Sequence, residues 1–133
     1  MNTRNQMLCA WSGIAFILAF FVGYWVIAEY VPPHSPLSSA EQIAEIYKQN
    51  ATQIRLGMML TMLGTGFAMP WTALISVQLR RIEHVNPVLT YTQLISGTIG
   101  LVAVLVPLFI WTVAAYRPDR DPDTIMLLND FAW

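Results

Sequence analysis

Hydrophobic and polar positions are segregated into long blocks along this chain. Three stretches, from Asn5 to Ala28, from Leu56 to Leu79 and from Val85 to Tyr116, contain no Asp, Glu, Lys, Arg or His. Each is longer than the roughly 20 residues that an α-helix needs to cross the hydrocarbon core of a bilayer. The pattern predicts an all-α transmembrane helical bundle with spans at about residues 7–31, 54–79 and 88–116.

A proline-rich turn and a short amphipathic helix are predicted between the first two spans. Pro32-Pro33 ends the first span because proline lacks the backbone donor that a helix needs. The segment Ser38-Ser39-Ala40-Glu41-Gln42 holds two overlapping capping boxes, which indicate a helix at about residues 39–50. This helix is expected along the membrane surface, and the sequence leaves open whether it bends near Asn50 or continues directly into the second span. Its apolar side consists of Ala40, Ile43, Ala44 and Tyr47.

Small and hydroxyl-bearing residues form stripes on two of the predicted spans. Such stripes let helix backbones approach closely, so they predict helix–helix interfaces. Pro70 predicts a kink in the second span, and Gln93 in the third span is expected to face other helices rather than lipid. The stripe on the second span is Gly57, Thr61, Gly64, Thr65, Ala68 and Thr72, and the shorter one on the third span is Ser96, Gly97 and Gly100.

A fourth helix is predicted after the third span. Asp121 as N-cap and Pro122 as first helical residue are typical of a helix that begins at about residue 122. The residues from Thr124 to Trp133 reach about 15 Å, which is half the hydrocarbon thickness. We interpret this helix as the start of a fourth span in a longer protein. The alternative is a helix that lies in the interface or ends against a partner.

Alternating crossings assign the polar segments to two membrane faces. The ends of spans one and three and the starts of spans two and four share one face, which collects most of the acidic residues. Because Arg80-Arg81 directly follows the second span in a short loop, the positive-inside rule favours a cytoplasmic N-terminus. An aromatic belt is expected at the outer boundary from Tyr24, Trp25, Tyr30, Trp111 and Tyr116. The inner face carries Arg4, Arg80, Arg81, Glu83 and His84.

Composition agrees with a membrane protein and disfavours other classes. Of the 133 residues, 56% are hydrophobic and 11% are charged, whereas soluble domains have about 25% charged residues. Nucleic acid is not an expected partner, because the net charge is −1 and phosphate binding needs several clustered cations. Cys9 is the one cysteine, so it forms no internal disulfide, and we interpret it as a buried apolar residue.

Charges at the hydrocarbon boundary are the candidate site residues. Arg55 is expected to pair with Glu29 or Asp130, because a charge at that depth needs a partner. The same carboxylates with His34 offer an alternative role in cation binding or proton relay, although no His or Cys spacing of a metal site is present. Neither a metal nor a cofactor is therefore expected.

A second polar cluster lies in the loop before the fourth helix. Its residues could serve a membrane enzyme, but acidic loops interrupted by proline more often form turns and helix caps. An enzyme is therefore disfavoured. The cluster consists of Arg117, Asp119, Arg120 and Asp121.

Five segments resemble an uncharacterised family of bacterial polytopic inner-membrane proteins. The resemblance covers nearly the whole chain and implies a multi-pass protein of the bacterial cytoplasmic membrane, of which this chain is the N-terminal portion. It implies no activity and no site residues. The segments are Pro32-Pro33-His34-Ser35-Pro36, Ser39-Ala40-Glu41-Gln42-Ile43-Ala44, Ile54-Arg55-Leu56-Gly57-Met58, Ile75 to Glu83 and Tyr116 to Pro122.

Two functional hypotheses follow from these patterns. The first is a helix-packing or accessory membrane component, whose spans contact lipid and pack with partner helices or subunits. The second is a transporter or permease-like carrier for a small hydrophobic compound. In the second hypothesis, Pro70, Pro107 and Gln93 line a broken-helix cavity near the midplane of the membrane.

Overall fold

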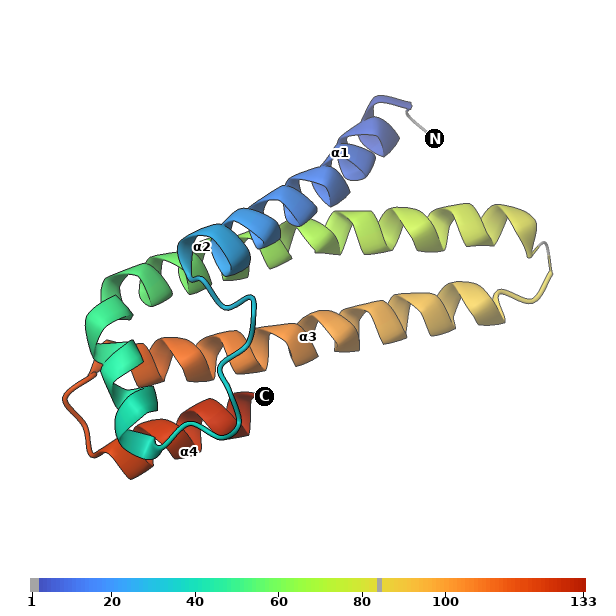
Figure 1. The fold of residues 1–133 in the computed structure, drawn as a ribbon. Helices are drawn as coiled ribbons and strands as arrows, with labels where there is room; N and C mark the ends of the chain where they lie inside the picture. The colour runs from blue at the N-terminus through green and yellow to red at the C-terminus, as the bar shows by residue number, and fades with distance from the viewer. Residues whose placement is uncertain (1–2, 84) are drawn as a thin grey trace.

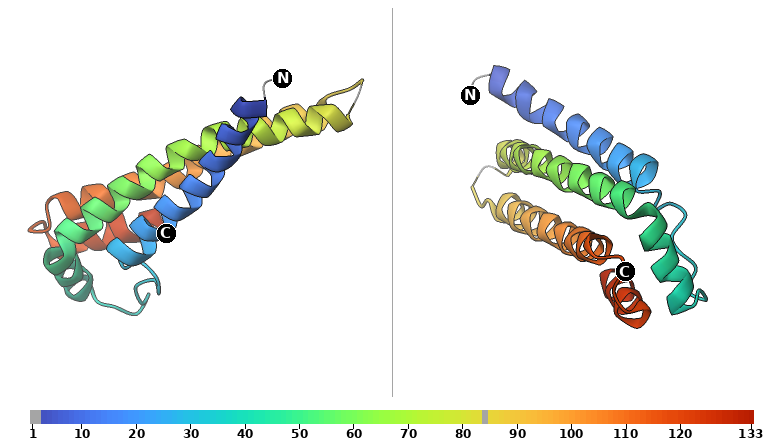
Figure 2. Two further views of the ribbon diagram at one scale, coloured as in Figure 1. Left: turned by 90° about the horizontal axis from the view of Figure 1, so that it is seen from above. Right: turned by 90° about the vertical axis from the view of Figure 1, so that its left-hand side faces the viewer.

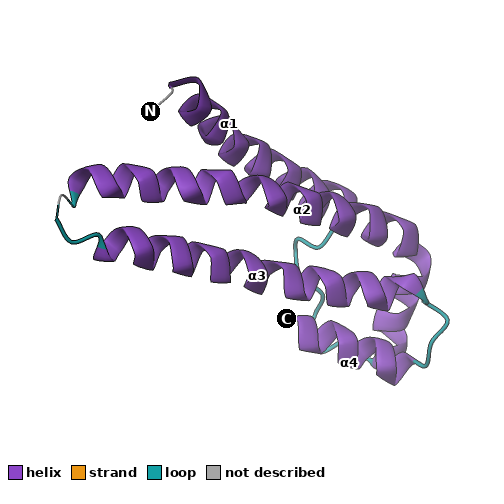
Figure 3. Ribbon diagram, turned by 180° about the vertical axis from the view of Figure 1, so that it is seen from behind, coloured by secondary structure: helices purple, strands orange, loops and turns teal. Residues whose placement is uncertain are grey.

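The protein is helical over almost its whole length. The computed structural model describes residues 3–83 and 85–133, so His84 lies outside the described residues. Loops are confined to the connections between helices, and the described ranges contain no strand (Figure 3). The elements in chain order are α1 (Thr3–Phe20), the π-helix η1 (Phe21–Ile27), α2 (Ala40–Ile82), α3 (Val88–Tyr116) and α4 (Pro122–Ala132) (Figure 1).

The long helices lie side by side with α2 in the middle. α1 and α3 pack on opposite sides of α2, and within the described ranges their backbones do not meet (Figure 2). Three segments, Thr3–Ile27, Ala40–Ile82 and Val88–Tyr116, are long and apolar enough to cross a membrane. The expected all-α fold with three candidate spans is therefore confirmed, and we call this arrangement the three-helix row.

The predicted surface helix and the second span form one unbroken helix. The Ser39 hydroxyl accepts the Gln42 N–H at 3.4 Å, and the Gln42 side chain accepts the Ser39 N–H at 3.0 Å. This is the second of the two overlapping capping boxes. The ribbon then changes direction in its teal-to-green part without leaving the helical conformation (Figure 1). The two alternatives are thus both present, because α2 is continuous and also bent.

The apolar side of residues 40–50 faces the protein interior. Ile43 and Tyr47 are only 3% and 0% exposed, and Ile43 belongs to the same apolar core as Ile125 of α4. Covering this side with α4 removes the apolar area that would otherwise seek a membrane surface. The apolar side of this amphipathic segment therefore packs inside the protein.

The first helical segment ends at Ile27, ahead of the predicted end at residue 31. The Ala28 N–H donates to the Gly23 carbonyl at 3.0 Å, and Glu29 then adopts a φ of 55°, in the left-handed region. A left-handed residue cannot continue a right-handed helix. The chain therefore leaves the helix at Glu29, before it reaches the prolines.

The small-residue stripe of α2 forms the helix interfaces. A Cβ atom on Gly64 would lie 2.6 Å from the Cβ of Ala19 in α1, so only glycine permits this approach. Every member of the stripe is buried, which confirms the prediction for the second span. The stripe of α3 is used only at Gly97, where a Cβ would lie 2.5 Å from Cγ2 of Thr72, whereas a Cβ on Gly100 would meet no atom of another helix within 4 Å. Ser96 is likewise exposed.

Candidate functional site

Three buried polar side chains are linked where the elements of one end of the row converge. Tyr30 follows η1, Tyr47 belongs to α2 and Asn129 to α4, and their exposed fractions are 1%, 0% and 4%. The Tyr30 hydroxyl donates to the Tyr47 oxygen at 2.6 Å, and the Tyr47 hydroxyl donates to Asn129 Oδ1 at 3.0 Å. We call this set the tyrosine–asparagine chain, and the end of the row that holds it the capped end.

Helical spacing puts these groups in the core. Tyr47 lies one turn after the buried Ile43, and Asn129 lies one turn after the buried Ile125. Buried polar groups are costly unless they are hydrogen-bonded, and the tyrosine–asparagine chain satisfies the hydroxyls of Tyr30 and Tyr47. Burial, together with the Tyr47 hydroxyl, raises the pKa of Tyr30, so its phenol stays a hydrogen-bond donor. The arrangement therefore joins three distant segments into one unit.

Aromatic rings surround the tyrosine–asparagine chain. The ring of Trp111 lies 5.0 Å from Tyr30 and 5.0 Å from Trp133, centroid to centroid. Trp111 is 4% exposed, so this residue and Tyr30 belong to the core instead of the predicted aromatic belt. Trp25 and Tyr116 are 50% and 64% exposed, in keeping with that belt. The belt prediction is wrong for Tyr30 and Trp111 because α4 and the connector after η1 cover them.

A recess of about 270 Å³ adjoins this core beside His34, Asn129, Asp130 and Trp133. Burial lowers the pKa of the His34 imidazole, and the Asn129 side chain offsets part of that change. In the part of the chain that the structure describes, His34 Nδ1 and Trp111 Nε1 are buried polar atoms without a hydrogen-bond partner. Residues 3–83 and 85–133 contain no group of three or more His, Cys, Asp or Glu side chains placed to hold a metal ion.

The predicted partners of Arg55 are not brought to it. Arg55 Nε donates to the Ala51 carbonyl at 3.1 Å and Nη2 donates to Thr52 Oγ1 at 3.2 Å, both on its own helix. Glu29 is exposed, and Asp130 is also exposed and accepts from Asn129 Nδ2 at 3.4 Å. The predicted pairing is wrong, because acceptors one turn earlier on α2 satisfy the guanidinium locally.

Gln93 lies against a neighbouring helix, as its position in the third span suggested. Its Oε1 accepts a hydrogen bond from the Ser76 hydroxyl of α2. Pro70 and Pro107 lie inside α2 and α3, and both helices continue through them. Gln93 therefore takes part in helix packing, and neither proline forms the broken helix on which the carrier hypothesis depends.

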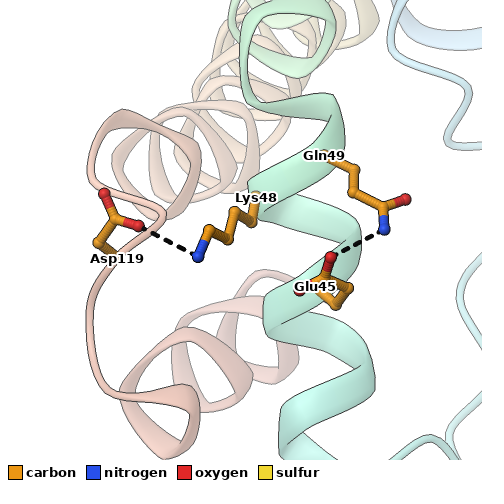
Figure 4. A network of polar contacts seen from close by, with 4 residues as sticks. All are labelled: Glu45, Lys48, Gln49 and Asp119. Carbon is orange, nitrogen blue, oxygen red and sulfur yellow. Dashed lines mark hydrogen bonds and ion pairs between the residues drawn. The ribbon is translucent and has the colours of Figure 1, made fainter.

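The polar loop before α4 serves several separate contacts. Asp121 Oδ2 caps α4 by accepting the Thr124 N–H at 3.3 Å, and Arg120 Nη1 donates to the Val113 carbonyl at 3.4 Å. Asp119 forms an ion pair with Lys48 at 3.6 Å, and Arg117 is exposed. Figure 4 shows this ion pair next to the contact between Gln49 and Glu45 on α2. The cluster does not converge on one point, so its geometry is that of a turn and a cap.

The tyrosine–asparagine chain was missed by sequence reasoning. Its one local signal is Asn129, a polar residue at helical spacing from Ile125. Nothing in the sequence assigns Tyr47, 82 residues earlier, as its partner. Comparison with known proteins adds no relative, since no protein-family model, curated protein or solved structure matches this chain.

Proposed function

We propose that the protein is a multi-pass membrane protein with a helix-packing or accessory role. The outward sides of α1 and α3 are the observation that carries this proposal, because they consist of large exposed apolar side chains. A surface of this kind causes aggregation in water but matches the interior of a bilayer. Examples are Leu8 at 61%, Trp11 at 62% and Leu18 at 59% on α1, and Ile95 at 59%, Ile99 at 63% and Phe109 at 58% on α3.

The same proposal covers the capped end of the row. We place it at one membrane boundary, where residues 40–50 of α2 turn their polar side outward. α4 runs back along α3, and its exposed Leu127 and Phe131 (68% and 75%) support its assignment as the start of a fourth span. The bacterial cytoplasmic membrane and a cytoplasmic N-terminus are inferred from the resemblance described above and from Arg80-Arg81.

The open row supports an accessory role in particular. Because α1 and α3 do not pack on each other, the row leaves long apolar faces for lipid or for helices of another subunit. The carrier alternative has no comparable support, since α2 and α3 are unbroken at their prolines.

Insertion and topology can be tested together. The full chain is expressed with a compartment-specific reporter fused after Arg81 or after Asp119, and its membranes are washed with alkaline carbonate. The protein should stay in the membrane pellet, and the two reporters should indicate opposite compartments. Release of the chain without detergent, or the same compartment for both fusions, would overturn the proposal.

The accessory role needs a separate measurement. A photo-crosslinking residue is placed at Ile99, 63% exposed on α3, and as a control at Leu37, 93% exposed in the connector before α2. A packing role predicts a protein adduct of defined mass from Ile99 and none from Leu37. If positions on the outward sides of α1 and α3 yield lipid adducts alone, the accessory role is wrong, although the membrane assignment stands.

A further inference from the structure

An apolar groove between α2 and α3 ends at two arginines. It has a volume of about 570 Å³, and Ala73, Val77 and Leu94 line its apolar part. Arg80 and Arg81 border the same groove in the last turn of α2, at the end of the row opposite the capped end. A long apolar surface that leads to clustered cations is the pattern of a site for an amphiphile with a negative head.

Two of the hydroxyl groups that line the groove, those of Ser76 and Thr90, already have partners. Ser76 donates its hydroxyl to Gln93, and Thr90 Oγ1 donates to Glu83 Oε2 at 2.5 Å. An occupant would therefore meet no unpaired hydroxyl from these two residues, and the wall that it contacts is apolar. Such a wall suits a hydrocarbon chain better than a polar solute.

The charge balance at the end of the groove is positive. Arg80 and Arg81 are both exposed. Glu83, the carboxylate that follows them in the chain, accepts the N–H groups of Leu89 and Thr90 at the start of α3, at 2.6 and 2.8 Å, and also feels the charge of Arg80. Two guanidinium groups and this one carboxylate leave a net positive charge at this end of the groove. Guanidinium groups bind phosphate through paired, charge-assisted hydrogen bonds.

The dimensions match one leaflet of a bilayer. From Ala73 to Arg81 the helix rises about 12 Å, at 1.5 Å per residue. Half of the hydrocarbon thickness is about 15 Å, so the apolar part of the groove stays within one leaflet and the arginines reach the headgroup level. We propose that this groove binds an anionic phospholipid, with an acyl chain along Ala73, Val77 and Leu94 and the phosphate at Arg80 and Arg81. The inference rests on the membrane function proposed above.

Lipid retention by the purified full chain tests the site. The protein in mild detergent is titrated with phosphatidylglycerol or with phosphatidylcholine of the same acyl chains, and bound lipid is counted by native mass spectrometry. Phosphatidylglycerol should bind at least about fivefold more tightly, and Arg81→Gln should weaken its binding about fivefold, which is the usual effect of one basic residue at an anionic lipid surface. Arg117→Gln removes the same charge from an exposed arginine at the capped end and should change nothing.

Two further measurements distinguish binding in the groove from nonspecific attraction between the lipid and positive charges on the protein. Ala73→Trp fills the apolar part and should lower the retention of phosphatidylglycerol with both arginines in place. Inorganic phosphate in excess should not displace the lipid, because the acyl chain supplies part of the affinity. Equal binding of the two lipids, equal losses in Arg81→Gln and Arg117→Gln, no effect of Ala73→Trp, or displacement by phosphate would each overturn the site. If the protein passes the carbonate and reporter tests but shows such a result, the lipid site is wrong and the proposed membrane function stands.

Discussion

Tyr47 donates its hydroxyl hydrogen to Asn129 Oδ1 at 3.0 Å, across 82 residues of sequence. The same Tyr47 oxygen accepts the hydroxyl of Tyr30, so one side chain of α2 holds both the connector after η1 and α4. All three residues are buried, so water does not replace either hydrogen bond when it is broken, and its loss costs free energy. This junction fixes the bent part of α2 against the rest of the row.

Removal of the Tyr47 hydroxyl should destabilise the protein. Tyr47→Phe keeps the ring but leaves the Tyr30 hydroxyl and Asn129 Oδ1 without their partner, which typically costs about 1–3 kcal/mol. Thermal unfolding in detergent should show a lower midpoint for Tyr47→Phe. Tyr116→Phe, at a residue that is 64% exposed, is the matched control and should unfold like the wild type. Equal midpoints for the two variants would show that the junction contributes no stability.

Two glycines of α2 should respond in opposite ways to alanine. At Gly64 the new Cβ would lie 2.6 Å from the Cβ of Ala19, and the helices must separate to relieve that contact. Overpacking of this kind costs about 1–3 kcal/mol. A Cβ on Gly66 would meet no other atom within 4 Å beyond its own stretch of helix, so Gly66→Ala should leave stability unchanged or raise it by up to about 1 kcal/mol through helix propensity. Unfolding midpoints of the two variants measure the difference, and a stable Gly64→Ala protein would contradict the close approach of α1.

Glu83 should make stability depend on pH in the acid range. Desolvation raises the pKa of its carboxyl, but hydrogen bonds from Thr90 and Leu89 and the charge of Arg80 outweigh it and lower the pKa below 4.5. A depressed pKa in the folded state means that the stabilisation is fully present above pH 4.5 and is lost as the pH falls through the folded-state value. The unfolding midpoint should therefore differ between wild type and Glu83→Gln at pH 7, and this difference should shrink toward pH 3.

Thr90→Val provides a second check on the same contact. The substitution removes the hydroxyl donor to Glu83 and leaves the backbone donors of Leu89 and Thr90. The decrease of its unfolding midpoint between pH 7 and pH 3 should therefore lie between the decreases of wild type and Glu83→Gln. If the unfolding midpoints of wild type and Glu83→Gln differ by the same amount at pH 7 and at pH 3, Glu83 is not the source of the pH dependence.

The ion pair between Lys48 and Asp119 should matter little for stability. Its side chains are 61% and 81% exposed and 3.6 Å apart, and pairs of this kind contribute about 0–1 kcal/mol. Lys48→Met should therefore shift the unfolding midpoint less than Tyr47→Phe, and added salt should bring the wild type closer to the variant. A loss as large as that of Tyr47→Phe would show that the loop before α4 is held mainly by this charge pair.

The helices could be predicted from the sequence because their signals are local. Charge-free stretches gave the third helix at its observed bounds, and the Asp121-Pro122 pair gave the start of α4. The small-residue stripe identified the packed side of α2, since a side chain that must admit a neighbouring backbone has to be small. The cap that Asp121 forms on α4 is local in the same way, whereas the tyrosine–asparagine chain was not predicted.

Contacts between distant segments could not be predicted. Arg55 was expected to pair with a carboxylate, yet acceptors on its own helix satisfy it. Tyr30 and Trp111 were expected at the lipid boundary, but α4 and the connector cover them. The sequence by itself determined which segments are helical and apolar, because hydrophobicity and capping act within one segment. Only the tertiary structure decided which segments pack against one another, since burial depends on which other segments arrive there.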